Sequence, residues 1–211
     1  MSLPDPTHPD QRRQHWDKVY ATKASTQVSW YQTVPAVSLS LIRASGVGPA
    51  AKIIDIGGGA STLADHLLAE GYHAVTVLDV ASAALDQSKQ RLGPAADQIK
   101  WLVADITTWQ PTTHYDLWHD RAVFHFLTDP QDRSAYLTAL KSAVHPGATV
   151  ILATFALDGP ERCSGLPVHR YSPETLATEL GHEFTLVQTE SEEHQTPSGA
   201  IQRFVYCRFT R

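Results

Sequence analysis

The 211-residue sequence has little cysteine, with Cys163 and Cys207 alone and no C-x-x-C pair. Two cysteines cannot build a disulfide framework, although they leave a single bridge open. No His/Cys pair has the spacing of a zinc-binding motif. We therefore expect reduced thiols and no bound metal.

The sequence also lacks a run of Lys and Arg and a long apolar run. The formal net charge is −5, which argues against binding to a phosphate backbone as the main activity. No apolar stretch approaches the roughly 18 residues of a membrane span, and the N-terminus lacks the apolar core of a signal peptide. These absences predict a soluble, cytoplasmic protein that contacts neither nucleic acid nor membrane.

The residues that are present suit one globular domain over residues 1–211. With 42% hydrophobic residues, a chain of this length buries about 70% of its unfolded surface around a single core. Residues 1–10 are rich in proline and polar groups, so we expect them to be mobile. Helices are predicted at 11–21 and 37–44, and neither a repeat nor a linker is visible.

A glycine-rich turn between a strand and a helix is the most informative motif. Residues 53–56 suit a buried strand, and the three glycines at 57–59 end it in a turn that a ligand can approach closely. A second predicted strand, 74–79, ends at Asp79, 20 residues beyond the last glycine. An acid at this distance is typical of binding to ribose hydroxyls. The motif predicts a nucleotide-binding site.

The glycine spacing argues against a dinucleotide. A G-x-G-x-x-G fingerprint that starts at Gly57 needs glycine at position 62, where the chain has Thr62. An NAD-dependent oxidoreductase is further opposed by the missing Tyr-x-x-x-Lys pair. It stays open as an alternative, as does a nucleotide-binding protein without catalysis.

The rest of the chain alternates helices and strands, which predicts a mostly parallel sheet. Helices are expected at 61–70, 82–92, 130–144 and 173–180, and strands at 99–106, 115–120 and 149–155. The last two strands, 184–190 and 201–209, flank a turn with Pro197 and Gly199, which is typical of an antiparallel hairpin.

The glycine turn resembles the first motif of the class I S-adenosylmethionine-dependent methyltransferases, an acidic residue followed by x-G-x-G-x-G. Asp55, Gly57 and Gly59 match it, and Ser61 replaces the third glycine. The runs 99–106 and 115–120 resemble the third and fourth strands of the family, so the resemblance covers most of residues 50–155. It implies an α/β, Rossmann-like fold with a seven-stranded, mostly parallel sheet, an antiparallel C-terminal hairpin and helices on both faces.

The resemblance also implies S-adenosylmethionine as cofactor and S-adenosylhomocysteine as product. The glycine turn is expected near the amino-acid part of the cofactor, Asp79 at the ribose, and Asp105 with the Ile106 backbone at the adenine. The expected cofactor-binding residues are Asp55, Gly57, Gly58, Gly59, Ser61, Asp79, Val80, Asp105, Ile106, His119 and Trp30.

We expect catalytic residues in the segment 119–126, at the carboxyl end of the strand predicted at 115–120, because open α/β sheets place ligands beyond the carboxyl ends of their strands. His119 and His125 are candidate general bases, since histidine titrates near neutral pH, and Arg121 is a candidate clamp for a carboxylate. The alternative is a polar network that fixes this loop, with His125 packed beneath it. The segment lacks the Asn/Asp-Pro-Pro-Tyr/Phe pattern of methyltransferases that act on amino groups of bases or glutamine.

Two further segments are candidates for contact with substrate. The resemblance implies that residues 11–46 form a helical lid in which Trp30 and Tyr31 cover the cofactor; the alternative is a core anchor. The long loop 159–171 is the other segment, and its Cys163 either contacts a soft substrate or is a buried, inert thiol. The expected catalytic residues are His119, Arg121 and His125, and the substrate-binding residues are Tyr31, Arg121, Phe124, Cys163, His169 and Arg170.

These features lead to one functional hypothesis with one main alternative. We expect methyl transfer from S-adenosylmethionine to sulfur, oxygen or nitrogen of a small molecule, with aromatic residues as pocket walls. The alternative is a protein side chain, lysine above all. The acceptor atom and the oligomeric state cannot be predicted from the sequence.

Overall fold

The computed structural model describes residues 9–211. Helix α1 (Pro9–Thr22) begins two residues before the predicted helix 11–21, within the segment expected to be mobile. For residues 1–8 the expectation lies outside the described residues.

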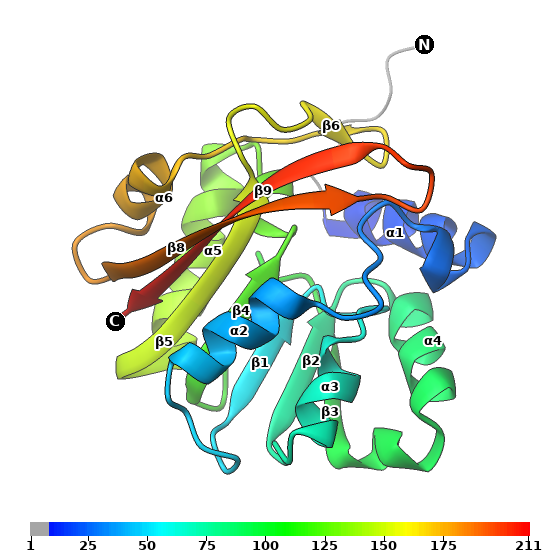
Figure 1. Cartoon of the computed structure of the whole chain (residues 1–211), viewed down its shortest axis with the longest axis horizontal. Coiled ribbons are helices and arrows are strands. Elements are labelled where there is room, and N and C mark those ends of the chain that lie inside the picture. The colour runs from blue at the N-terminus through cyan, green and yellow to red at the C-terminus, as the bar shows by residue number, and fades with distance from the viewer. Residues whose placement is uncertain (1–8) are drawn as a thin grey trace.

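Seven strands form one sheet in the order β3-β2-β1-β4-β5-β9-β8 (Figure 1). Strands β1 to β5 pair in parallel, and β9 is inserted antiparallel between β5 and β8. The predicted fold class is therefore confirmed. The strands are β1 (Ile53–Ile56), β2 (Val75–Asp79), β3 (Ile99–Val103), β4 (Tyr115–Arg121), β5 (Val144–Phe155), β8 (Thr185–Gln195) and β9 (Ile201–Thr210).

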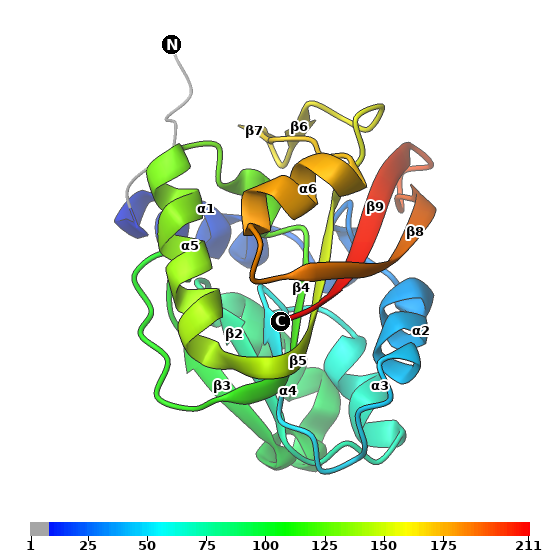
Figure 2. The same ribbon diagram turned by 90° about the vertical axis from the view of Figure 1, so that its left-hand side faces the viewer.

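Helices cover both faces of the sheet. Apolar side chains of α2, α3 and α4 pack on one face, and those of α5 and α6 pack on the other (Figure 2). Every residue of β1 and β2 is buried as a result, as expected for parallel strands between two helical layers. The helices are α2 (Ala36–Ala44), α3 (Leu63–Ala69), α4 (Ser82–Leu92), α5 (Pro130–Ala143) and α6 (Pro173–Leu180), with 3₁₀ turns η1 (Ser25–Gln27), η2 (Gly93–Gln98) and η3 (Phe124–Phe126).

The carboxyl ends of the parallel strands lie at one edge of the sheet, which neither of the two helical layers covers. Helix α1 lies across this edge of the sheet, and residues 23–35 lead from it to α2 (Figure 1). Trp16 of α1 packs edge to face on Trp30 of the connecting segment and on Phe126, with ring centroids 5.7 and 5.0 Å apart. This cover encloses the space beyond the strand ends.

The largest differences from the sequence-based expectations are in three elements. Strand β5 begins at Val144 instead of residue 149, and β8 continues to Gln195 instead of residue 190. The added part of β8 is polar, as suits an edge strand with a solvated face, so it carries no hydrophobic pattern. The loop 159–171 contains a small hairpin, β6 (Arg162–Cys163) with β7 (Leu166–Pro167).

A buried polar network fixes the segment after β4. The Asp120 carboxylate accepts from the Val123 N–H at 2.9 Å and from the Tyr136 hydroxyl at 2.6 Å. The same hydroxyl accepts from the Trp118 indole N–H at 2.9 Å. Burial raises the pKa of Asp120 to about 6, although these hydrogen bonds oppose the shift. The network holds Ala122 at a positive φ of 72°, where the chain leaves the strand.

Replacing Tyr136 with phenylalanine should lower the free energy of unfolding by about 2–3 kcal/mol, because the Trp118 N–H and Asp120 each lose a buried partner. Chemical denaturation measures this. Tyr171→Phe is the matched control, since the buried Tyr171 hydroxyl has no hydrogen-bond partner. Its removal should leave stability unchanged or slightly raised. Equal losses in the two variants would show that the network does not stabilise the fold.

Candidate functional site

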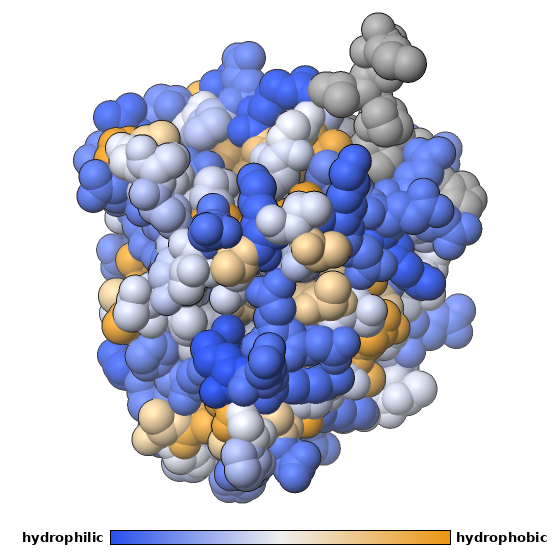
Figure 3. Space-filling model, turned by 90° about the vertical axis from the view of Figure 1, so that its right-hand side faces the viewer, coloured by the Kyte–Doolittle hydropathy of each residue, from blue (hydrophilic) through white to orange (hydrophobic). Residues whose placement is uncertain are grey.

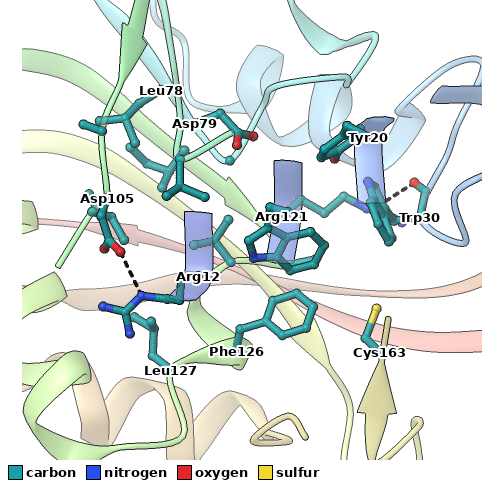
Figure 4. A pocket seen from close by; sticks show the side chains of 18 residues that line it. Arg12, Tyr20, Trp30, Leu78, Asp79, Asp105, Arg121, Phe126, Leu127 and Cys163 are labelled. Atoms are coloured by element: carbon teal, nitrogen blue, oxygen red, sulfur yellow. Dashed lines mark hydrogen bonds and ion pairs between the residues drawn. The ribbon is translucent and has the colours of Figure 1, made fainter. Parts of the chain in front are cut away.

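A cavity lies beyond the carboxyl ends of β1 to β4, beneath α1 and the segment that follows it (Figure 4). Its walls combine strand-end residues with aromatic side chains of the cover. It brings together eight residues predicted from the sequence. They are Trp30, Gly57, Asp79, Val80, Asp105, Ile106, Arg121 and Cys163.

The glycine turn needs glycine for steric reasons. Gly57 has a φ of +67°, and a Cβ on it would lie 2.1 Å from Val123 Cγ2. A Cβ on Gly59 would lie 2.4 Å from Asp79 Oδ2. The Gly59 N–H instead donates to that oxygen at 3.0 Å. The turn and the end of β2 therefore hold each other in place.

Asp79 presents a carboxylate to the cavity from the end of β2. It accepts hydrogen bonds from Gly59 N and from Ala81 N at 2.8 Å. Burial raises the pKa of Asp79 to about 6, because removal from water disfavours the charged form more than these two bonds favour it. A ligand that donates further hydrogen bonds would favour the ionised form.

Asp105 follows β3 and is joined to the cover by Arg12 of α1. The Arg12 Nε–Asp105 Oδ2 distance is 2.8 Å, and Arg12 Nη1 lies 2.6 Å from Asp132 Oδ2 at the start of α5. The Asp105 Oδ1 atom accepts from Thr107. Arg12 could not be predicted as a site residue from the sequence, because no local pattern shows that α1 crosses the end of β3.

A second, more polar pocket adjoins the first beneath the glycine turn, and the two share Trp30, Gly57 and Arg121. Here Asp55 Oδ1 lies 2.7 Å from His119 Nδ1, and His119 Nε2 lies 2.9 Å from Ser38 Oγ on α2. The other oxygen of Asp55, Oδ2, is buried without a hydrogen-bond partner. This pocket also contains the predicted residues Asp55, Gly58, Ser61, His119 and Tyr31.

The histidines predicted as general bases do not have the required geometry. Both ring nitrogens of His119 are already hydrogen bonded, so it belongs to the polar network that was the alternative interpretation. His125 is fully buried outside both pockets, and its Nδ1 accepts from the Phe155 N–H at 3.2 Å. Burial lowers the pKa of His125 to about 3. The prediction that His125 is catalytic is therefore wrong.

Arg121 faces the cavity, but its donors are engaged. It donates through Nε to the Tyr206 hydroxyl at 2.7 Å and through Nη1 to the Trp30 carbonyl at 3.1 Å, and Nη2 lies 3.4 Å from Glu192 Oε2. The guanidinium also lies over the Phe204 ring. Arg121 therefore fixes the cover at Trp30, and three of its five N–H donors are engaged in protein contacts, which leaves fewer for the predicted clamp on a substrate carboxylate.

The other predicted substrate residues divide between the cavity and the rest of the fold. The prediction that Phe124 binds substrate is wrong, because Phe124 packs in the core against Tyr136 and Tyr171. Its neighbour but one, Phe126, lines the cavity instead. His169 and Arg170 lie outside both pockets: His169 packs on Tyr171, and Arg170 donates to Gly159 O.

Cys163 lines the cavity from β6 and is buried. Burial raises the pKa of the Cys163 thiol to about 11, so it is protonated at neutral pH. Its sulfur lies 4.0 Å from Ser29 Oγ on the covering segment. Cys207 is also a free, buried thiol. The expectation of reduced cysteines is therefore confirmed.

Comparison with known proteins identifies the domain. Residues 53–147 match the family model described as a methyltransferase domain. Among curated proteins, the malonyl-[acyl-carrier protein] O-methyltransferase of Anoxybacillus flavithermus is 38% identical over 93 residues, which are 43% of this chain and 35% of that protein. The eEF1A lysine and N-terminal methyltransferase of Mus musculus is 27% identical over 93 residues, 44% of this chain and 13% of that protein. The match thus spans well under half the length of these relatives.

Solved structures match over nearly the whole chain. A SAM-dependent methyltransferase from Anabaena variabilis has a TM-score of 0.76 at 18% identity, with 100% of this chain and 98% of that chain covered. The 1,6-didemethyltoxoflavin-N1-methyltransferase of Burkholderia thailandensis, solved with S-adenosylhomocysteine, has a TM-score of 0.72 at 18% identity, with coverages of 100% and 94%. No helix in residues 9–211 is both long and apolar enough to cross a membrane. Residues 53–147 thus match a methyltransferase domain, and the chain as a whole has the fold of solved S-adenosylmethionine-dependent methyltransferases.

Proposed function

We propose that this protein transfers the methyl group of S-adenosylmethionine to a small molecule bound in the cavity. One observation carries the proposal: a single, partly open cavity joins Gly57 of the glycine turn and the carboxylates of Asp79 and Asp105 to a group of aromatic side chains. The strand-end part suits a nucleoside, and the aromatic part leaves room for an acceptor beside it. Enclosed, mostly apolar spaces with a few polar groups are typical of small-molecule sites.

The residues of this chain fit the cofactor. Asp79 would accept from the ribose hydroxyls, and Asp105 with the Ile106 backbone would hold the adenine. The polar pocket would take the amino-acid end, where the unpartnered Asp55 Oδ2 offers an acceptor to the ammonium group. His119 and Ser38 would hold Asp55 in position.

The bound cofactor supplies an electrophilic methyl group on a sulfonium. The protein supplies position and a dry surrounding, because methyl transfer needs a nucleophile in line with the methyl carbon. Arg121 donates to the Trp30 carbonyl and so holds the Trp30 backbone over the cavity. The Trp16 ring packs against the Trp30 ring. This cover would exclude water while the acceptor is aligned.

A protein acceptor is the second candidate, supported by the name of the Mus musculus relative. The face shown in Figure 3 is largely polar, with hydrophobic side chains in small separate patches. The exposed large hydrophobic residues of the described chain lie on different elements, whereas docking surfaces commonly have a contiguous apolar patch. These features favour the small molecule.

A labelling assay tests the proposed function. The protein is incubated with S-adenosylmethionine carrying a labelled methyl group and with a cell extract divided into low-molecular-weight and protein fractions. We expect label in the low-molecular-weight fraction, with S-adenosylhomocysteine formed in equal amount. Label confined to the protein fraction would favour the second candidate, and absence of labelling and of cofactor binding would contradict both.

The affinity for S-adenosylhomocysteine should fall about tenfold between pH 7.5 and pH 5, because ribose hydroxyls donate best to ionised Asp79, whose pKa is about 6. Calorimetric titration at several pH values measures this.

Folding stability should respond in the opposite direction. The folded pKa of Asp79 lies above its unfolded value, so the stability from its protonated form is present below about pH 4 and is lost as the pH rises through about 6. Weaker binding at pH 5 is then not caused by unfolding of this site. An Asp79→Asn variant should show little change in its affinity for S-adenosylhomocysteine with pH. If its affinity fell between pH 7.5 and pH 5 as much as that of the wild type, Asp79 would not be the group responsible.

A further inference from the structure

The part of the cavity away from the strand-end carboxylates is walled by Trp16, Trp30 and Phe126, with Cys163 and Arg121 beside them. We call it the aromatic compartment. The three rings meet edge to face through Trp16. In Figure 4, Trp30 and Cys163 lie on the opposite side of the view from Asp105 and Arg12, and Phe126 lies between the two groups. Such walls suit a flat aromatic molecule, because ring faces and edges remain for offset or edge-to-face contact.

Proton acceptors are missing from the aromatic compartment, as far as residues 9–211 define it. Its polar side chains are two indoles and the Arg121 guanidinium, which only donate, and the Cys163 thiol. Cys163 keeps its proton, since burial raises the pKa of the thiol to about 11. Tyr20 at the edge of the compartment also keeps its proton, because burial raises its pKa.

His119, His125 and Glu192 near the compartment do not replace the missing base. His119 uses both nitrogens, and His125 lies outside the cavity. Glu192 accepts from Arg121, Tyr206 and Gln32 and does not line the cavity. Asp79 and Asp105 stand at the ends of β2 and β3, where the proposed function assigns them to the nucleoside.

The transfer itself releases no proton when the acceptor atom has a lone pair and carries no proton. That lone pair forms the bond to the methyl carbon, and the electron pair of the carbon–sulfur bond stays on the sulfur, which becomes a neutral thioether. A neutral ring nitrogen gains one positive charge, and a thiolate becomes a neutral thioether. A phenol or an alkylammonium must first lose a proton, for which the compartment offers no acceptor.

We propose that the acceptor is a flat aromatic compound methylated at an atom whose lone pair is free at neutral pH, a ring nitrogen or an aryl thiolate. This inference rests on the proposed function and narrows its substrate class. It accounts for an aromatic compartment without a base, and it disfavours lysine side chains and alkyl amines.

The first test measures binding to the S-adenosylhomocysteine complex. Quinoline and thiophenol are titrated into it, with cyclohexanethiol as the non-aromatic match of thiophenol, and tryptophan fluorescence or calorimetry gives the dissociation constants. We expect the two aromatic probes to bind about tenfold more tightly than cyclohexanethiol, because each ring contact adds to the apolar burial. Equal or weaker binding of the aromatic probes overturns the inference.

The second test compares turnover of thiophenol and quinoline with that of phenol, each corrected for reaction without enzyme. Phenol should react at least about 100-fold more slowly than thiophenol, since general-base assistance typically contributes 10²–10⁴-fold and phenol is protonated at neutral pH. Phenol turnover as fast as that of thiophenol overturns the inference, and so does the absence of turnover of both bound aromatic probes.

A pair of variants locates the site. Trp16→Leu should raise the KM for thiophenol about tenfold, since a wall of the compartment is lost. Trp109→Leu is the matched control, because Trp109 packs on Trp118 outside the cavity; its KM should stay at the wild-type value. Equal effects would overturn the location. Failure of S-adenosylhomocysteine itself to bind would defeat the proposed function, whereas failure of the probes with the complex intact defeats this inference alone.

Discussion

An Asp79→Ala variant should bind S-adenosylhomocysteine about 100-fold more weakly than the wild type. A hydrogen bond to a charged group contributes about 1.5–3 kcal/mol, and we propose that Asp79 accepts from two ribose hydroxyls, so a loss of about 3 kcal/mol corresponds to two orders of magnitude. The substitution also removes the acceptor of the Gly59 N–H, which loosens the glycine turn. Calorimetric titration at pH 7.5 measures the change.

The matched control for this substitution is Asp86→Ala. Asp86 lies exposed on α4, where it pairs with Lys89, so its removal should leave the dissociation constant within about twofold. Thermal unfolding without ligand shows whether each variant folds. An Asp79→Ala protein that folds and binds S-adenosylhomocysteine as tightly as the wild type would show that Asp79 is not a cofactor ligand.

A Gly59→Ala variant should lose at least about 30-fold in affinity for S-adenosylhomocysteine. Its Cβ would lie 2.4 Å from Asp79 Oδ2 and 2.5 Å from Ala84 Cβ, so the carboxylate and α4 must move apart. Overpacking of this kind costs about 1–3 kcal/mol, and here the displaced group is a proposed ligand. Titration and thermal unfolding together divide the loss between binding and folding.

Gly48→Ala provides the comparison for the glycine effect. Nothing lies within 4 Å of a Cβ at Gly48, and its φ is not positive, so binding and stability should stay close to wild type. If Gly59→Ala behaved like Gly48→Ala, the close approach of the turn to Asp79 would have no bearing on the cofactor site.

The residues at the strand ends could be predicted because their signal is local. The glycine turn, Asp79 and Asp105 each follow an apolar strand directly, and the parallel order of the strands brings their ends to one edge. Helix α5 was equally predictable, since Asp129 caps it and Pro130 occupies its first position. These elements need no knowledge of distant contacts.

The contacts that complete the site join distant parts of the chain. Arg12 meets Asp105 across 93 positions, and His119 meets Ser38 across 81. Neither pairing leaves a periodicity or spacing in the sequence, because each depends on how α1 and α2 pack against the finished sheet. The same reason explains why Arg121 was predicted as a free clamp, although Tyr206 of β9 engages its Nε.

The error at Phe124 has a different cause. Residues 124–126 form a single 3₁₀ turn, which is too short to establish a hydrophobic period, so the sequence does not show which ring faces the core. The structure buries Phe124 and His125 and directs Phe126 to the cavity. Short turns next to a site are therefore the places where assignment from sequence fails.

The most direct test of the account is a calorimetric titration of the wild-type protein with S-adenosylhomocysteine, with NAD as the competing ligand, at pH 7.5. The account predicts micromolar binding of S-adenosylhomocysteine at one site per chain and no binding of NAD. A folded protein that binds NAD, or that binds no S-adenosylhomocysteine, would contradict it.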